Sequence, residues 1–324
     1  MNTDPIPSAS LSSVVLPSHS TEFSSLAALP SNVDALEAAL LFSNTHVPFV
    51  VISGPSGCGK TQLLDASRDF LKHHSDEDVE MMSASQFLKL QRRVDMRKVL
   101  ILDDCHEVMQ QPKQMLQFRM AMDRRVKSSR PTMLAVTKGV CRKWTSAIPA
   151  ERKWRVEEIS EPGLSERVSL VQHMARSEKL QLSDTFARII ALKLKGNARV
   201  VKGALHTLRL EKGIWLEPSE VLRGCGMLNP FFEDNSTWDL RHSIFRRTEL
   251  FKEGMDADEV KAMSVYLMLK VAGLPEAAVA QYFGCPGSVC YQGRQEFAKK
   301  LAESAQLRHE LLACVEATVE HLAR

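Results

Sequence analysis

The sequence predicts an α/β domain with a parallel sheet, followed by two all-α parts. Two observations predict this class. Short apolar, β-branched runs alternate with helical stretches up to about residue 160, and only helical patterns follow. The chain has 324 residues, which is enough for two or three domains. We therefore predict a tail at 1–20, an α/β domain at 21–160, a helical segment at 161–222 and a helical C-terminal domain at 223–324.

The elements of the α/β domain follow in the order helix, strand, loop, helix. An amphipathic helix is expected after Ser31 or Asn32, either of which is a suitable N-cap. Three apolar runs predict strands buried on both faces, at 47–53, 98–104 and 132–137. Helical stretches lie between them at 61–74 and 113–130. Beyond residue 162 we expect helices at 164–178, 183–196 and 198–213, a linker at 224–236 and a final helical group from 238 onward.

Composition favours a soluble globular protein, because 44% of the residues are apolar and 25% are charged. No apolar run reaches the roughly 20 residues of a transmembrane helix, so we expect no membrane span. The first 20 residues are rich in Ser and Pro and do not resemble a signal peptide, so we expect a disordered tail and a cytoplasmic protein. The seven cysteines form no CxxC pair, which favours reduced thiols; they are Cys58, Cys105, Cys141, Cys225, Cys285, Cys290 and Cys314.

The net charge of +3 is too small to indicate a nucleic-acid partner by itself. Its distribution is more informative, since residues 221–324 carry 12 basic and 14 acidic side chains. The positive surplus therefore lies in the first two thirds of the chain.

A glycine-rich motif follows the first predicted strand and precedes a predicted helix. It fits G-x-x-x-x-G-K-[ST] in full, and this context is the one that a phosphate-binding loop requires. Lys60 would reach the β- and γ-phosphates, and the Thr61 hydroxyl would bind Mg²⁺. A chance Gly-rich turn is the alternative, and both flanks argue against it. We predict ATP and Mg²⁺ as ligands of Gly54, Pro55, Ser56, Gly57, Cys58, Gly59, Lys60 and Thr61.

Two carboxylates end the second predicted strand. Because the carboxyl ends of parallel strands meet at one edge of a sheet, Asp103 is the candidate Mg²⁺ ligand and Asp104 the candidate activator of the attacking water. The alternative is that both residues only cap the following turn. Thr137 and Lys138 end the third strand and could sense the γ-phosphate, or they could form a solvent-exposed strand end.

The order of these motifs resembles the AAA+ class of ATPases, and more narrowly the DnaA family of bacterial replication initiators. A Gly-Asn-x-Arg-x-x-x-Gly-Ala-Leu pattern of that family is matched by Gly196, Asn197, Arg199, Gly203, Ala204 and Leu205. The resemblance implies an AAA+ P-loop fold with a helical lid at 161–222. It implies that Arg199 contacts the γ-phosphate, that Asn32 lies on the adenine side, and that ATP-dependent self-assembly is reversed by slow hydrolysis.

The family also places an arginine finger, which acts on the neighbouring subunit's nucleotide, in the stretch that corresponds to 149–162. Arg152 is the first candidate and Arg155 the second; the alternative is that both are surface arginines. Several departures limit the resemblance, and one of them is that Thr137, Lys138 and Gly139 lack the family's aspartate. The family's N-terminal partner-binding domain is missing, and the stretch before the second strand is short. The residues that start the recognition helix are replaced by Gly287, Ser288, Val289 and Cys290.

Residues 262–301 resemble the helix-turn-helix domain of the DnaA family, which implies binding to double-stranded DNA. The turn would lie at 284–287 and the recognition helix after it. The candidate DNA-binding residues are Ser288, Tyr291, Gln292, Arg294 and Gln295 for bases, Lys299 and Lys300 for phosphates, and Arg241, Arg246, Arg247 and Lys252 in a second basic stretch. A third basic stretch could line an assembly face or a DNA-facing pore, or simply be solvated; it holds Arg119, Arg124, Arg125, Lys127 and Arg130.

Two functions follow from these observations. The first is an ATP-dependent, weakly hydrolysing DNA-binding protein of the DnaA type, which assembles on the nucleoid during initiation or regulation of replication. The second is an ATP-dependent regulator, adaptor or helicase loader that binds another replication protein instead. The acidic sum of residues 221–324 favours the second, because phosphate contacts supply most non-specific DNA affinity.

Overall fold

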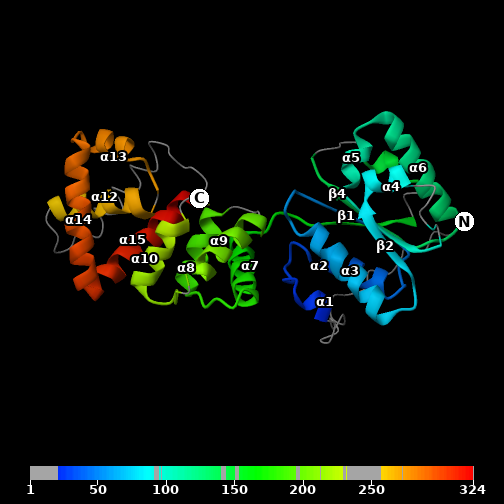
Figure 1. Ribbon diagram of the computed structural model, residues 1–324, viewed down its shortest axis with the longest axis horizontal. Helices are drawn as coiled ribbons and strands as arrows, with labels where there is room; N and C mark the ends of the chain where they lie inside the picture. Colours follow the sequence, from blue (N-terminus) through cyan, green and yellow to red (C-terminus); the bar gives the residue numbers. More distant parts are fainter. Residues whose placement is uncertain are drawn as a thin grey trace, which may run out of the picture.

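The structure is a computed structural model. It describes residues 21–90, 95, 97–139, 144–149, 153–194, 198–211, 213–228, 231, 257–271 and 273–323. For residues 318–323 it describes the backbone only. An α/β domain and a helical part lie side by side along the long axis of the molecule (Figure 1). The predicted tail at 1–20 lies outside the described residues.

The α/β domain contains a five-stranded sheet within the described ranges, in the order β2-β3-β4-β1-β5, and every pair of neighbours is parallel. The three predicted strands are confirmed as β1 (Phe49–Gly54), β3 (Val99–Asp103) and β4 (Thr132–Thr137). They occupy the middle of the sheet and are buried on both faces, which is why they are continuous apolar runs.

The two edge strands were not predicted. They are β2 (Val79–Ser83) and β5 (Arg155–Glu158). Both are short and partly exposed, and β5 alternates half-buried with exposed residues. An edge strand can carry charged side chains on its open side, so neither segment shows the apolar run that marks a central strand.

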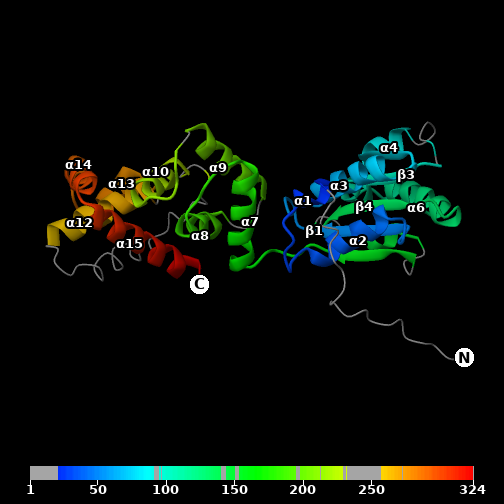
Figure 2. The ribbon, with the colours of Figure 1, turned by 90° about the horizontal axis from the view of Figure 1, so that it is seen from below.

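Helices cover both faces of the sheet (Figures 1 and 2). Val50 and Ile52 of β1 pack with α1 (Thr21–Ser24), α2 (Val33–Ser43) and α3 (Lys60–His74). Phe49 and Val51 face the opposite side, toward the core formed by the second group of helices. That group consists of α4 (Ala84–Leu90), α5 (Cys105–Met109), α6 (Pro112–Lys127) and the 3-10 helix η1 (Trp144–Ala147).

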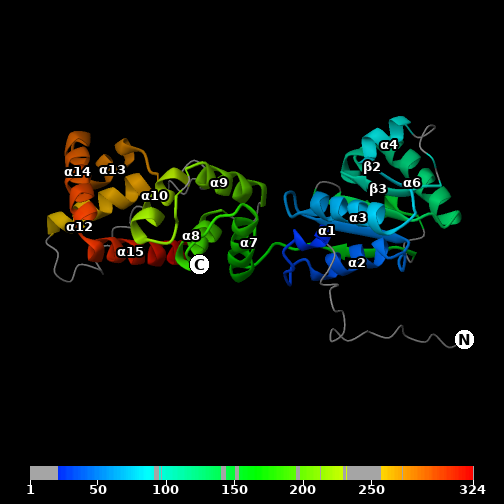
Figure 3. The same ribbon diagram turned by 60° about the horizontal axis from the view of Figure 1, so that its bottom comes forward.

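The helical part begins with α7 (Leu164–Ser177), α8 (Asp184–Lys193), α9 (Ala198–Leu210) and α10 (Pro218–Leu228). It continues with α12 (Ala257–Tyr266), the π-helix η4 (Leu267–Val271), α13 (Glu276–Phe283), α14 (Gly287–Glu303) and α15 (Ala305–Ala323). The last helix runs back from α14 and packs against α8 and α10 (Figure 3). One hydrophobic core therefore runs through the whole helical part. None of the helices in the described ranges is long and apolar enough to cross a bilayer.

The predicted linker at 224–236 starts in a helix instead of a turn, since residues 224–228 form the end of α10. The predicted domain boundary at 222 likewise falls inside this helix. Gly224 lies so close to its neighbours that an added Cβ would stand 2.5 Å from Phe186 Cζ and 3.1 Å from Trp215 Cε3. The glycine thus permits close helix packing, whereas the sequence suggested a break in the chain.

Gly224→Ala is expected to destabilise the helical part by about 1–3 kcal/mol, because the added methyl overpacks a fully buried ring. Gly293→Ala in α14 is the matched control, since nothing lies within 4 Å of its Cβ position. That control should gain roughly 0.5–1 kcal/mol of helix propensity. Urea unfolding followed by circular dichroism measures both, and equal stability of the two variants would contradict the packing role.

Candidate nucleotide-binding site

The phosphate loop connects the end of β1 to the start of α3 through glycines that other residues could not replace. Gly57 and Gly59 have φ values of +78° and +97°, in the left-handed region that favours glycine. A Cβ on Gly54 would stand 2.7 Å from the Ile159 carbonyl oxygen and 2.8 Å from Cys58 Sγ. The loop therefore curls tightly and directs the first N–H groups of α3 toward the position of an anion, as expected for a phosphate site.

Lys60 lies inside this loop and is only 7% exposed. Its ammonium donates hydrogen bonds to the carbonyl oxygens of Gly54 at 3.0 Å and Pro55 at 2.7 Å. It also lies 3.8 Å from Cys58 Sγ. A buried cation held by neutral carbonyls in a curled loop is well placed to meet a phosphate.

Thr61 and Asp103 are brought together although they are 42 residues apart. The Thr61 hydroxyl donates to Asp103 Oδ2 at 2.7 Å, and Asp103 Oδ1 accepts from the Asp104 N–H at 2.7 Å. The alternative prediction, that these carboxylates cap the following turn, therefore holds for Asp103, whose side chain accepts a hydrogen bond from the turn. The same carboxylate and hydroxyl are a pair of hard oxygen donors beside the phosphate loop, and they fit the chemistry that Mg²⁺ prefers.

Asp104 follows in the left-handed region, with φ +50°, at the N-cap of α5. Asp tolerates this conformation better than most residues. Partial burial, followed by repulsion from Asp103, raises the pKa of Asp104. His106 Nδ1 lies 3.9 Å from Asp104 Oδ1 and is buried without a hydrogen-bond partner among the described atoms. It therefore faces the candidate water activator.

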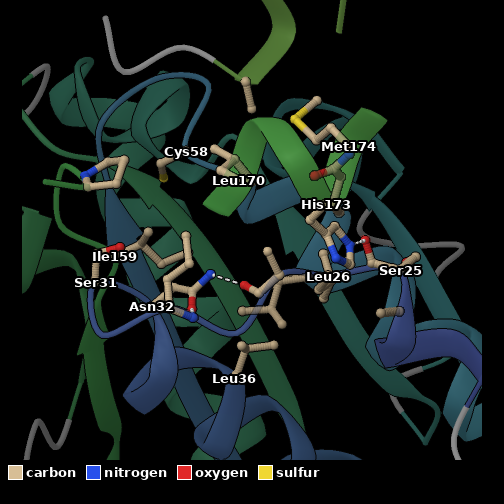
Figure 4. Close-up of a pocket in the computed structure, with 18 of the residues that line it drawn as sticks. Ser25, Leu26, Ser31, Asn32, Leu36, Cys58, Ile159, Leu170, His173 and Met174 are labelled. Atoms are coloured by element: carbon tan, nitrogen blue, oxygen red, sulfur yellow. Dashed lines mark hydrogen bonds between the residues drawn. The ribbon is translucent and has the colours of Figure 1, made fainter. Parts of the chain in front are cut away.

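A cavity of about 360 Å³ opens beside the loop, between the α/β domain and α7 (Figure 4). Its size suits a small-molecule ligand. Asn32, which precedes α2, and Leu36 of α2 lie on one wall, and Leu170 and Met174 of α7 lie on the other. Asn32 occupies the N-cap position as predicted but does not cap the helix with its side chain. Its amide instead donates to Ala27 O at 2.9 Å and accepts from Leu29 N at 2.8 Å, which shapes the cavity wall.

Two side chains of α7 fasten the helical part to the loop around Asn32. The Glu166 carboxylate accepts from Ser31 N at 2.8 Å and from Gly163 N at 2.7 Å. His173 Nε2 lies 3.0 Å from Ser25 O. Lys202 of α9 also lines the cavity. Sequence reasoning missed these three residues, because contacts across such separations leave no local pattern.

Lys138 lies at the end of β4, where the sequence suggested a sensor. Its N–H donates to Gly54 O at 2.9 Å, so its backbone is attached to the phosphate loop. Its side chain reaches Glu158 Oε1 at 2.5 Å, across the end of β1. Thr137 is buried in the strand instead. Lys138 is therefore the residue of this pair that is accessible beside the loop.

The remaining predicted residues of the nucleotide site fall into two groups. Arg155 lies in β5, where its guanidinium pairs with Glu37 and Glu157 at 2.8 Å each, so these local ion pairs already hold it. Arg199 is exposed at the start of α9, next to Ala198, which lines the cavity. Arg152, Gly196 and Asn197 lie outside the described residues.

The candidate base-reading residues other than Arg294 lie on one exposed face of α14. Ser288, Tyr291, Gln292 and Gln295 are exposed, and Gln295 Nε2 donates to Tyr291 Oη at 2.8 Å. Arg294 is less free than expected, since it stacks 4.7 Å from the Tyr291 ring centroid and lies 3.4 Å from Glu276. Lys300 pairs with Glu259. The predicted residues Arg241, Arg246, Arg247 and Lys252 fall outside the described residues.

One member of the third basic stretch is not at the surface. Arg125 is fully buried and donates to Thr132 Oγ1 at 2.7 Å and to the carbonyl oxygens of Lys98 and Pro131. Burial lowers its pKa to about 10. Arg125 thus joins α6 to β3 and β4, and it cannot belong to an assembly or DNA-facing surface. Arg119, Arg124, Lys127 and Arg130 are exposed.

No protein-family model matches the sequence, and no curated protein matches it. Solved structures do resemble the fold. Domain III of the replication initiation protein DnaA from Thermotoga maritima has a TM-score of 0.55 at 18% identity, over 65% of this chain and 96% of that chain. AMPPCP-bound DnaA from Aquifex aeolicus has a TM-score of 0.50 at 17% identity, over 91% of this chain and 96% of that chain. The Holliday junction branch migration motor RuvB from Thermotoga maritima has a TM-score of 0.44 at 16% identity, over 79% and 81%. At these identities the first two likenesses show a DnaA-like AAA+ fold and nothing beyond the fold.

Proposed function

We propose that this protein is an ATP-dependent DNA-binding protein of the DnaA type, acting in the cytoplasm on the nucleoid in initiation or regulation of replication. ATP binding favours its assembly on double-stranded DNA, and slow hydrolysis reverses that assembly. The observation that carries the nucleotide part is the 2.7 Å contact between Thr61 and Asp103, because it unites two distant motifs beside the phosphate loop. AMPPCP-bound DnaA, an ATP-analogue complex of similar fold, supports it.

Each residue of the site has a separate task. The N–H groups of the loop and Lys60 hold the phosphates, and the cavity between α2 and α7 receives the base. Thr61 and Asp103 would hold Mg²⁺, which neutralises phosphate charge when bound. Asp104 orients the attacking water and accepts its proton. The residues of α7 and α9 that line the cavity report the nucleotide to the helical part.

Arg199→Ala is expected to leave ATP binding within a few fold but to reduce the preference for ATP over ADP by roughly tenfold. The reason is that a charge-assisted hydrogen bond to the γ-phosphate contributes about 1.5–3 kcal/mol. Titrations with fluorescent ATP and ADP analogues measure both affinities. Lys202→Ala, which removes a second cation of α9 that lines the cavity, is the variant for comparison. A larger loss of preference in Lys202→Ala would assign the sensing role to Lys202 instead.

Arg152 is the proposed arginine finger, supplied to the neighbouring subunit. If it acts in trans, mixing Arg152→Ala subunits with Asp104→Asn subunits should restore part of the ATPase activity, because some interfaces then contain neither defect. Activity of the mixture equal to the mean of the two separate variants would refute this role.

The proposed DNA site is the exposed face of α14 with its polar residues Ser288, Tyr291, Gln292 and Gln295 and the exposed Lys299. An exposed helix that follows a tight turn can enter the major groove, where amide side chains pair with adenine. The test is a gel shift with random and family-type duplexes over a salt series, with ATP present and folding verified. A shift that weakens steeply with salt is expected.

The second candidate function is an ATP-dependent regulator, adaptor or helicase loader that binds another replication protein. The pairing of Arg294 with Glu276 and of Lys300 with Glu259 favours it, since both carboxylates oppose the approach of phosphates. A complete lack of a gel shift at low salt, with folded protein and ATP, would reject DNA binding in favour of this candidate.

A further inference from the structure

A pair of thiols lies at the turn between α13 and α14, away from the nucleotide site. Cys285 is in the turn, and Cys290 is in the first turns of α14. Their sulfur atoms are 3.3 Å apart, and both thiols are free. A disulfide bond has an S–S length of about 2.05 Å, so the sulfurs need to approach by only about 1.2 Å.

The surroundings of the turn allow this approach. Nothing lies within 4 Å of the Cβ positions of Gly284 and Gly287, which flank the turn, and Gly284 has φ +59°. The turn therefore has space to move, whereas Cys290 is held in the core at 2% exposure. Closure of the bond would draw Cys285 and its turn toward the buried Cys290.

We propose that Cys285 and Cys290 form a reversible disulfide on exposure to hydrogen peroxide and that this bond alters how the start of α14 meets DNA. The bond itself is independent of the proposed function, whereas its effect on DNA binding rests on it.

The chemistry balances with peroxide as the oxidant. The half-buried Cys285 thiol is the accessible one, and peroxide converts it to a sulfenic acid with release of water. The Cys290 sulfur then attacks the Cys285 sulfur, and the sulfenic oxygen leaves as a second water with the Cys290 proton. Burial, and then the neighbouring Cys285 thiol, raise the pKa of Cys290 to about 11, so Cys290 is the resolving thiol and Cys285 the one oxidised first. A dithiol reductant restores both thiols.

The consequence concerns the residues next to Cys290. Ser288 and Val289 lie between the two cysteines and are exposed, and Tyr291 follows directly. Movement of the turn displaces Ser288 and Val289 relative to the rest of the exposed face of α14. Because the loss of one base contact weakens binding, we expect roughly tenfold weaker DNA binding by the oxidised protein.

The test uses the full chain, treated with hydrogen peroxide, then alkylated with N-ethylmaleimide and analysed by mass spectrometry after digestion. The expected product is a cross-link between the peptides of Cys285 and Cys290, lighter by two hydrogen atoms and reversed by dithiothreitol. Cys285→Ser, whose site lies in the half-buried turn, should lose this product while keeping its circular dichroism spectrum. Absence of the cross-link in the folded wild-type protein would refute the proposal.

Gel shifts and ATPase assays before and after oxidation complete the test. Oxidation should weaken DNA binding in the wild-type protein but not in Cys285→Ser, which excludes an effect through Cys58 in the phosphate loop. A cross-link with no DNA binding by the reduced protein would refute the proposed function and leave the thiol site standing. A cross-link with equal DNA binding in both states would refute the regulatory role.

Discussion

Lys60→Ala is expected to weaken ATP binding by about 100-fold or more, beyond detection in a titration at micromolar protein. Lys60 is 7% exposed, and its ammonium lies in the curl of the phosphate loop, bonded to Gly54 O and Pro55 O. A bound phosphate would exchange these neutral acceptors for charged oxygens, and each charge-assisted hydrogen bond contributes about 1.5–3 kcal/mol. Two such bonds account for the expected loss.

Thermal unfolding with and without ATP and Mg²⁺ measures this effect, since a ligand that binds only the folded state raises its midpoint. Wild-type protein should show the rise and Lys60→Ala should not. Lys72→Ala, which removes an exposed lysine from the last turn of the same helix, is the control for charge and should behave as wild type. An equal rise in all three proteins would refute the assignment of the phosphate loop.

The phosphate loop and the central strands could be predicted because their physics is local. A buried parallel strand must be apolar throughout, as β1, β3 and β4 are, and a loop with left-handed residues needs glycine at Gly57 and Gly59. The position of Asp103 and Asp104 followed from the same rule, because parallel strands end at one edge of the sheet. The Thr61–Asp103 contact confirms that the sequence brings these two motifs together.

The edge of the sheet and the walls of the cavity could not be predicted from local patterns. Strand β5 carries three charged residues that form ion pairs. Arg155 pairs with Glu37 of α2 and with Glu157 of β5 itself, and Glu158 pairs with Lys138. No apolar run marks such a strand. The hydrogen bond between Glu166 and Ser31 joins residues that are 135 positions apart in the sequence. Such a contact can be seen only in the folded structure.

Gly224 and Arg125 show how a residue type can mislead. Glycine predicted a linker, but at Gly224 the absence of a side chain allows α10 to approach Phe186 and Trp215. Arginine in a basic stretch predicted a charged surface, but Arg125 points inward and satisfies carbonyl groups at the start of the central strands. In both cases tertiary packing decides what the residue does, and the sequence window contains none of the partners.

Asp104→Asn is expected to retain ATP binding and to lose turnover by roughly 100- to 10,000-fold, the usual contribution of a positioned general base. Asn matches Asp in size and tolerates the left-handed conformation at φ +50°, so the turn after β3 should persist. The carboxamide cannot accept a proton from water at neutral pH. The neighbouring Thr61–Asp103 pair is untouched by the substitution, so the proposed Mg²⁺ ligands and the affinity for nucleotide should remain.

The measurement pairs a phosphate-release assay with a binding titration on the same preparation, because only the ratio of the two effects identifies the role. Glu107→Gln in α5 is the matched control: it removes an exposed carboxylate three residues further on and should leave both quantities unchanged. Lys60→Ala should not bind ATP, whereas Asp104→Asn should bind ATP without hydrolysing it. If Asp104→Asn hydrolyses ATP as fast as wild type, the Asp104 carboxylate is not needed for turnover and the water must be activated elsewhere. If it loses binding as well, Asp104 belongs to the nucleotide-holding group, and its assignment as water activator is wrong.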